Sequence, residues 1–305
     1  MDRIVVLLAT YNGARYLDAQ LMSIATQRVA ARIDVVVSDD GSRDGTLAQL
    51  AAWKARWTAG DFDIVAGPGR GFAENFRSLL TRLAGAPDYV AFSDQDDVWN
   101  PDKLDIAIRT IADAAGPALY CSRSLIVDAE LAPIGRSPLF QRPPAFRNAL
   151  VQSLAGGNTM VINGTAFELV AESARRTAFV SHDWWCYLLV SGAGGRVVYD
   201  PEPRIAYRQH GQNLVGHNAG WGARWQRLRR SMRGEFKRWN EINISALEAC
   251  RDLLSADSAA LLDQFKSLRA ANALRGLYLL QRSGIYRQLA AGNISLALAL
   301  ILRKL

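Results

Sequence analysis

The stretch DYVAFSDQDDVWNPDKL (residues 88–104) joins an apolar run, a group of acids and a helix start. Tyr89 to Phe92 have the length and composition of a buried strand. Pro101 follows at a position where a helix can begin. Between them lie three carboxylates within four positions, those of Asp94, Asp96 and Asp97. Like charges this close repel and raise one another's pKa, so the stretch destabilises the chain unless something neutralises it.

Three earlier apolar runs follow the same plan. They are RIVVLLAT (3–10), IDVVVSDD (33–40) and FDIVAGP (62–68), and each precedes a segment with apolar residues at helical spacing. Strands that alternate with amphipathic helices indicate βαβ units, and nearly continuous apolar strands indicate a sheet covered on both faces. The sequence therefore predicts an α/β fold, a Rossmann-like, mostly parallel sheet flanked by helices.

The pattern changes after residue 116. Strands are expected at 118–128 and 156–163, a helix at 181–194 and a bent strand pair at 196–210. From residue 220 onward only helical patterns occur. Three widely spaced cysteines without a CxxC motif favour a reducing, cytoplasmic compartment.

The carboxyl ends of parallel strands form the edge where ligands bind. The groups expected at this edge are Thr10-Tyr11-Asn12, Asp39-Asp40, Gly67-Pro68-Gly69 and Asp94 to Asp97. Asp39 can accept a hydrogen bond from a base or a ribose, although a simple turn is the alternative for its cluster. Arg70 is available for a phosphate, and Asn75 lies on the helix that follows.

The acids at 94–97 are short, hard oxygen ligands. A Mg²⁺ or Mn²⁺ ion that bridges a diphosphate takes one or two protein carboxylates, and phosphate oxygens and water complete its shell. The alternative is that these acids cap the helix that begins near Pro101. One carboxylate is enough for a cap, so three favour the metal.

Taken together in this order, the clusters resemble glycosyltransferase family 2, whose members have the GT-A fold. The resemblance rests on LLATYNGARYLDAQLMSI, VVVSDDGSRDGT, GRGFAENFRSLL and FSDQDDVWNPDKL, and it covers residues 3–215. The SDQDDVW version is most similar to the rhamnosyltransferase-like branch, which builds bacterial surface polysaccharides. A nucleotide-sugar transferase domain at 1–215 and a basic helical region at 216–305 are therefore expected.

The resemblance implies roles for single residues around the donor. Thr10 and Tyr11 would flank the base, with Asn12 beside them and Asp39 on the pyrimidine edge. The DxD pair, on the metal and the ribose, would be Asp94 and Asp96, with Asp97 as a supporting acid. His210, in YRQHGQN, would be a third metal ligand, although a lone histidine is more often a structural residue.

The motif SHDWW (181–185) stands where the family has a later acid pair, often written ED. His182 replaces the first acid, so Asp183 alone is the candidate base. Apolar neighbours, here Trp184 and Trp185, raise the pKa of a carboxylate and make it a better base, while a helix cap is the alternative role. The residues expected on the acceptor side are these two tryptophans, Gly157 and Asn158. A bulge or hairpin turn is the alternative for the glycine.

The C-terminal region carries the positive charge. Trp221 to Leu305 contain 15 Lys and Arg against 6 Asp and Glu, in a chain of net charge +7. Segment 221–239 (WGARWQRLRRSMRGEFKRW) places apolar residues at helical spacing among arginines. Such a helix can lie on an anionic membrane surface, here the inner face of the membrane, or pack on the catalytic domain. Nucleic-acid binding is a third option that nothing else in the chain supports.

The sequence predicts a metal-dependent, inverting glycosyltransferase. It would move a sugar from a dTDP- or UDP-linked donor to a hydroxyl of a glycan or lipid-linked acceptor. A sugar-nucleotide nucleotidyltransferase would share the fold and the metal, but TYNGARYL lacks the Gly-rich, basic loop that holds a triphosphate. A non-catalytic scaffold would have no need of Asp39, Asp94, Asp96 and Asp183.

Overall fold

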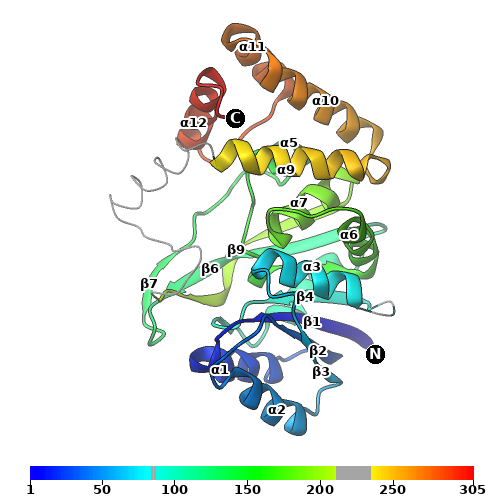
Figure 1. Cartoon of the computed structure of the whole chain (residues 1–305), viewed down its shortest axis with the longest axis vertical. Coiled ribbons are helices and arrows are strands. Elements are labelled where there is room, and N and C mark those ends of the chain that lie inside the picture. Colours follow the sequence, from blue (N-terminus) through cyan, green and yellow to red (C-terminus); the bar gives the residue numbers. More distant parts are fainter. Residues whose placement is uncertain (84, 86, 211–234) are drawn as a thin grey trace.

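The computed structural model of the chain describes residues 1–83, 85, 87–210 and 235–305. Figure 1 shows a central sheet with helices on both faces, and a further layer of helices formed by the C-terminal part of the chain. The strands are β1 (Asp2–Thr10), β2 (Ala31–Asp39), β3 (Phe62–Ala66), β4 (Tyr89–Ser93), β5 (Val98–Trp99), β6 (Ala118–Val127), β7 (Pro133–Arg136), β8 (Val161–Asn163) and β9 (Arg196–Arg208).

The strand order is β3-β2-β1-β4-β8-β6-β9-β5, and β7 pairs with the last residues of β6, beyond those that pair with β8. Strands β1 to β4 run parallel to one another. Strand β8 is antiparallel to both β4 and β6, and β6 and β9 pair in parallel. The mostly parallel sheet that the sequence predicts is therefore confirmed, with β8 as an antiparallel insertion.

Register brings the strand ends together at one edge. Thr10 pairs with Asp39, and Asp39 pairs with Ala66. Leu8 pairs with Ser93, so the acids after β4 begin beside the end of β1.

The helices are α1 (Ala14–Ala25), α2 (Thr46–Arg56), α3 (Phe72–Arg82), α4 (Lys103–Ile111), α5 (Phe146–Ala149), α6 (Gly164–Arg176), α7 (His182–Gly192), α9 (Glu235–Ala249), α10 (Ala256–Ala270), α11 (Ala273–Ser283) and α12 (Ala290–Ile301), with 3₁₀ turns η1 (Gly157–Thr159) and η2 (Arg251–Leu253).

Strand β1 shows why helices cover both faces of the sheet, since successive residues of a strand face opposite sides. Ile4, Val6 and Leu8 join a buried cluster with α1, α2 and α4. Val5 and Leu7 join another with α3, α6 and α7.

The C-terminal helices pack on the second of these clusters. Leu247 of α9 and Leu262 of α10 lie fully buried in the same apolar cluster as Phe146 and Trp184. This confirms the predicted helical extension. The expected boundary at residues 215 and 216, and residues 221–234 of the basic segment, lie outside the described residues. Among those described, no helix is both long and apolar enough to cross a bilayer.

Two segments differ from the predicted strands. Residues 196–208 form one strand, β9, and not a bent strand pair. Ser122 pairs with Asp200 and the next residue, Arg123, with Pro203, so the extra residues bulge out without ending the strand. Segment 156–163 begins with the turn η1, and only Val161–Asn163 are extended.

Candidate active site

Asp39 and Thr10 form the centre of the edge. Thr10 Oγ1 donates to Asp39 Oδ1 at 2.9 Å, and both residues are buried. Asp39 also accepts from Ser42 Oγ (2.5 Å), Ser42 N (2.9 Å) and Gly41 N (3.2 Å). A carboxylate has about four acceptor sites, and here the protein occupies all of them. Asp39 therefore shapes the loop at 41–42, and a donor from a ligand would have to share one of these oxygens.

The residues after β1 are held by Gln95 of the acidic loop, residues 94–97 after β4. Tyr11 N donates to Gln95 Oε1 (2.8 Å), and Gln95 Nε2 donates to the carbonyl of Tyr11 (3.0 Å). The Tyr11 side chain is exposed. Asn12 has a left-handed backbone (φ +49°), and its Oδ1 accepts from Arg43 N at 2.8 Å. The exposed Tyr11 side chain can therefore contact a ligand, whereas the Asn12 side chain stabilises the loop that contains Arg43.

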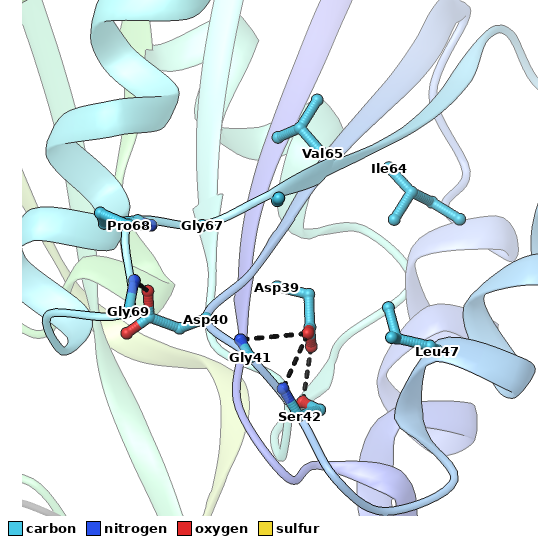
Figure 2. Close-up of a pocket in the computed structure, with 11 residues that line it drawn as sticks. Asp39, Asp40, Gly41, Ser42, Leu47, Ile64, Val65, Gly67, Pro68 and Gly69 are labelled. Carbon is cyan, nitrogen blue, oxygen red and sulfur yellow. Dashed lines mark hydrogen bonds between the residues drawn. The ribbon is translucent and has the colours of Figure 1, made fainter.

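A pocket of about 420 Å³ opens beside Asp39, which is within the size range of small-ligand sites. Figure 2 shows Leu47 and Ile64 on its apolar side and Asp39 and Asp40 on its polar edge, while the Val65 side chain points away from them. Asp40 fixes the glycine-rich segment that lines the pocket, because its oxygens accept from Gly69 N (2.7 Å) and Gly71 N (2.8 Å). An apolar wall with a polar edge suits a flat heterocyclic base.

Arg70 and Asn75, both predicted at the nucleotide, are placed differently. Arg70 is exposed on the loop that borders the pocket. Asn75 is buried, and its Nδ2 donates to the carbonyl of Ser38 at 2.9 Å. Asn75 therefore ties α3 to β2 beneath the pocket, and its side chain does not face solvent.

The three acids have different environments. Burial and the charges of Asp96 and Asp183 raise the pKa of Asp94 to about 7. Asp96 Oδ2 lies 2.8 Å from His210 Nε2. The His210 ring also packs against Tyr16, with centroids 4.8 Å apart. Asp94, Asp96 and His210, predicted as the metal ligands, therefore lie in one region of the structure.

Asp97 is fully buried and has an internal role. Its carboxylate accepts from Asn158 Nδ2 and from Arg208 N, the latter at 3.0 Å. Burial raises its pKa, and the charges of Asp96 and Asp94 add to the effect. Lys103 is also fully buried, with Nζ 3.3 Å from the centroid of the Trp99 ring. Burial lowers the pKa of Lys103, and the charge of Asp97 opposes this.

Asp183 lies in the first turn of α7, where the helix dipole favours negative charge. Ser153 Oγ approaches its Oδ2 at 3.4 Å. Its neighbour His182 packs on Phe92 of β4 with ring centroids 5.2 Å apart, so the start of α7 lies beside the strand that leads into the acids. Asp183 itself is partly exposed.

Its neighbour His182 is buried between aromatic rings. The imidazole stacks on Phe76 with centroids 3.7 Å apart, and burial lowers its pKa to about 4. A Cβ added to Gly157 would lie 1.9 Å from His182 Nε2, so only glycine fits there. Gly157 packs on His182, and Asn158 bonds to Asp97, so both organise the site from within.

The two tryptophans predicted on the acceptor side point into the core. Trp184 Nε1 donates to the carbonyl of Ala149 (2.7 Å), and Trp185 Nε1 donates to Ser173 Oγ (2.9 Å). Trp185 is fully buried and Trp184 nearly so. An acceptor cannot contact these buried indoles, because the apolar face of α7 packs against the core.

The arrangement fits a divalent cation. Burial raises the pKa of Asp94, and the charges of Asp96 and Asp183 add to this, so a cation at Asp94 would stabilise its charged form. Among the described residues, no three His, Cys, Asp or Glu side chains form a metal-binding group. Mg²⁺ needs only one or two carboxylates when phosphate and water supply its other ligands. Asp94 and Asp96 are enough for that arrangement.

Sequence reasoning missed Gln95 and Arg208, which hold the acidic loop through hydrogen bonds, and Lys103, which is buried over the Trp99 ring. Arg208 Nε donates to the carbonyl of Asp96 at 2.8 Å, and its guanidinium lies 4.5 Å from the Tyr16 ring centroid. Gln95 and Lys103 lie within residues 88–104, and Arg208 lies two residues before His210. The signal available was therefore proximity in sequence to predicted ligands.

Comparison with known proteins agrees with this geometry. Residues 5–167, more than half of the chain, match the family model described as Glycosyl transferase family 2. The chain is 29% identical over 231 residues to the dTDP-rhamnosyl transferase RfbG of Shigella flexneri, an alignment that covers 72% of this chain and 78% of that protein.

Two solved structures share the fold. TarS of S. aureus in complex with UDP-GlcNAc aligns with a TM-score of 0.53 at 14% identity, over 93% of each chain. GalNAc-T7 with UDP, GalNAc and Mn²⁺ aligns with a TM-score of 0.52 at 11% identity, over 69% of this chain and 44% of that one. The family match and the GT-A type of fold confirm the sequence-based prediction, and the chain belongs to glycosyl transferase family 2.

Proposed function

We propose that this glycosyltransferase moves a sugar, rhamnose being the first candidate, from a dTDP- or UDP-linked donor to an acceptor hydroxyl. The acceptor would be a glycan or a lipid-linked saccharide of a bacterial surface polysaccharide. The Shigella relative, a dTDP-rhamnosyl transferase, supports the donor sugar. The UDP-GlcNAc complex of TarS supports a nucleotide-sugar donor.

The donor's base would occupy the pocket beside Asp39. Leu47 and Ile64 offer an apolar surface, and the loop that Asp39 holds borders the base edge. Tyr11 is exposed next to this loop and can cover the ribose side. Arg70, on the loop after β3, can reach a diphosphate that extends from the pocket.

Asp94 and Asp96 would hold a divalent cation, with His210 in contact with Asp96. When bound, such an ion supplies positive charge against the departing diphosphate. GalNAc-T7, which shares the fold, was solved with Mn²⁺.

Asp183 would act as the base. Its carboxylate accepts the proton of the acceptor hydroxyl, and the hydroxyl oxygen attacks the anomeric carbon. The bond to the diphosphate breaks on the opposite face, its electron pair leaves with the phosphate oxygen, and the anomeric configuration inverts. The observation that carries this proposal is the position of Asp183 in the first turn of α7, next to His182. The His182 ring packs on Phe92 of β4 with centroids 5.2 Å apart, and Phe92 lies two residues before Asp94.

A hydrolysis screen without acceptor tests the proposal. The purified chain is incubated with dTDP-rhamnose, UDP-glucose, UDP-GlcNAc or GDP-mannose, with Mn²⁺, Mg²⁺ or EDTA. We expect a dTDP- or UDP-sugar to release its nucleoside diphosphate only when metal is present. Turnover in EDTA would refute the metal's role, and failure of every nucleotide sugar to bind or react would refute the donor class.

A further inference from the structure

Helix α12 has an apolar outer face. Its exposed residues are Ala290, Ala291, Ile294, Ser295, Leu298 and Ile301, and Leu302 follows them. At 3.6 residues per turn these side chains share an arc of about 140°. Only Ser295 in this arc is polar. The opposite face, with Leu296, Ala299 and Leu300, is buried in the core.

Such a helix departs from the usual pattern of a surface helix, whose outer face is polar. Ile294 is 64% exposed, Leu298 52% and Leu302 59%, so the arc is not covered by other described residues. A helix of 12 residues is too short to span a bilayer, which needs about 20. It is long enough to lie in the plane of a membrane surface.

Charge identifies the kind of surface. Residues 271–305 contain five Lys and Arg and no Asp or Glu, and of these Arg275, Arg282 and Arg303 are exposed. Arg287 instead donates to the carbonyl of Val151 inside the protein. Arg303 is exposed directly after the apolar arc. On α11, the exposed Leu274 and Tyr278 lie among Arg275 and Arg282, a composition typical of interfacial helices. Net positive charge next to exposed leucines is complementary to anionic lipid.

We propose that the exposed arc of α12, with Arg303 at its end, docks this enzyme on an anionic lipid surface. The inference rests on the proposed function for its purpose, since it would bring the site to a lipid-linked acceptor. It places the contact on α12, beyond the basic segment at 221–239.

The test is co-sedimentation of the full chain with vesicles of phosphatidylcholine, alone or mixed with phosphatidylglycerol. We expect binding to the mixed vesicles that falls as salt rises. Ile294→Gln should weaken it about tenfold, since it removes an inserted apolar side chain. Arg303→Gln should weaken it about fivefold. The matched controls are Ile134→Gln and Arg136→Gln on β7, where Ile134 is 58% exposed, and they should bind like the parent.

Three results would overturn the inference. One is no binding to mixed vesicles, and another is an equal loss in the α12 and β7 variants. The third is a parent dimer in sedimentation velocity that Ile294→Gln dissociates without any vesicle binding, which would assign the face to a second copy of the chain. Donor hydrolysis in free solution is measured on the same samples. Lost vesicle binding with intact hydrolysis rejects only this inference, and the reverse result rejects only the proposed function.

Discussion

Asp96 Oδ2 lies 2.8 Å from His210 Nε2, and this contact joins the acidic loop after β4 to the end of β9. Arg208 holds the same loop through the backbone carbonyl of Asp96. Two side chains from one strand end thus fix a residue that is far from them in sequence. The geometry explains how a loop with several like charges keeps a defined position.

Loss of the Asp96 charge should remove metal-dependent turnover. We expect Asp96→Asn to lower kcat by about 100-fold or more, and His210→Gln to raise the Mn²⁺ concentration needed for half-maximal activity about tenfold. The control is Asp63→Asn on β3, whose carboxylate is 66% exposed, and it should behave like the parent. Steady-state rates across a Mn²⁺ titration measure both effects. Parent-like turnover of Asp96→Asn at every metal concentration would contradict the assignment.

Asp39 should control nucleotide affinity through the loop that it shapes. In Asp39→Asn, an amide NH₂ takes the place of one carboxylate oxygen. That oxygen accepts either from Gly41 N and Ser42 N or from Thr10 Oγ1, and an NH₂ group cannot accept these hydrogen bonds. We expect dTDP and UDP to bind about tenfold more weakly, because the loop at the pocket's edge is no longer held. Calorimetry with Mn²⁺ present measures this, with Asp63→Asn as control. Unchanged affinity for both nucleotides would separate the pocket from the donor site.

Gly157 should not tolerate a side chain. Gly157→Ala places a methyl group against His182 Nε2 and should lower the free energy of unfolding by about 1–3 kcal/mol. Its neighbour Asn158 bonds to Asp97, so turnover should fall as well. Gly135→Ala is the matched control, since its added Cβ would meet nothing within 4 Å. Urea unfolding of both variants decides the point, and equal stability would show that the His182 contact has no consequence.

Acid should destabilise the fold through His182. Its pKa is lowered from 6.5 to about 4, so between these values the unfolded chain binds a proton that the folded chain does not. The free energy of unfolding therefore falls as pH decreases through this window, by up to about 3 kcal/mol. Asp94, with a pKa raised to about 7, contributes with the opposite sign, so parent and variant must be compared.

The variant His182→Gln isolates this contribution. It lacks the titrating group, so its free energy of unfolding should change less than the parent's between about pH 7 and about pH 4. Urea unfolding at the two pH values measures the difference. A variant that loses as much stability as the parent on acidification would place the acid sensitivity elsewhere.

Local pattern was enough to predict the α/β fold. The runs that became β1 to β4 are apolar throughout because helices cover both faces, and each ends in polar residues at the common edge. Because these strands are parallel, their ends place Thr10, Asp39 and Asp94 at one edge of the sheet, as the sequence predicts. Strand β9 was predicted as a bent strand pair, because the residues of the bulge between Asp200 and Pro203 have the composition of a turn.

Side-chain direction was not predictable at the site. Trp184 and Asp183 are adjacent, yet the Trp184 side chain is buried in the core whereas Asp183 is partly exposed beside Ser153, and only tertiary packing decides which. Asn75 followed a Gly-rich turn as a ligand would, but it bonds to β2. Contacts between distant segments, such as Asn158 with Asp97, leave no trace in a single sequence.

The proposed metal-dependent sugar transfer requires Asp183 as its base. Single-turnover transfer by Asp183→Asn, with dTDP binding measured on the same protein, separates this role from donor binding. We predict that the rate falls about 100- to 10,000-fold while dTDP affinity in Mn²⁺ stays like the parent's. A variant that transfers sugar at near the parental rate would contradict the claim.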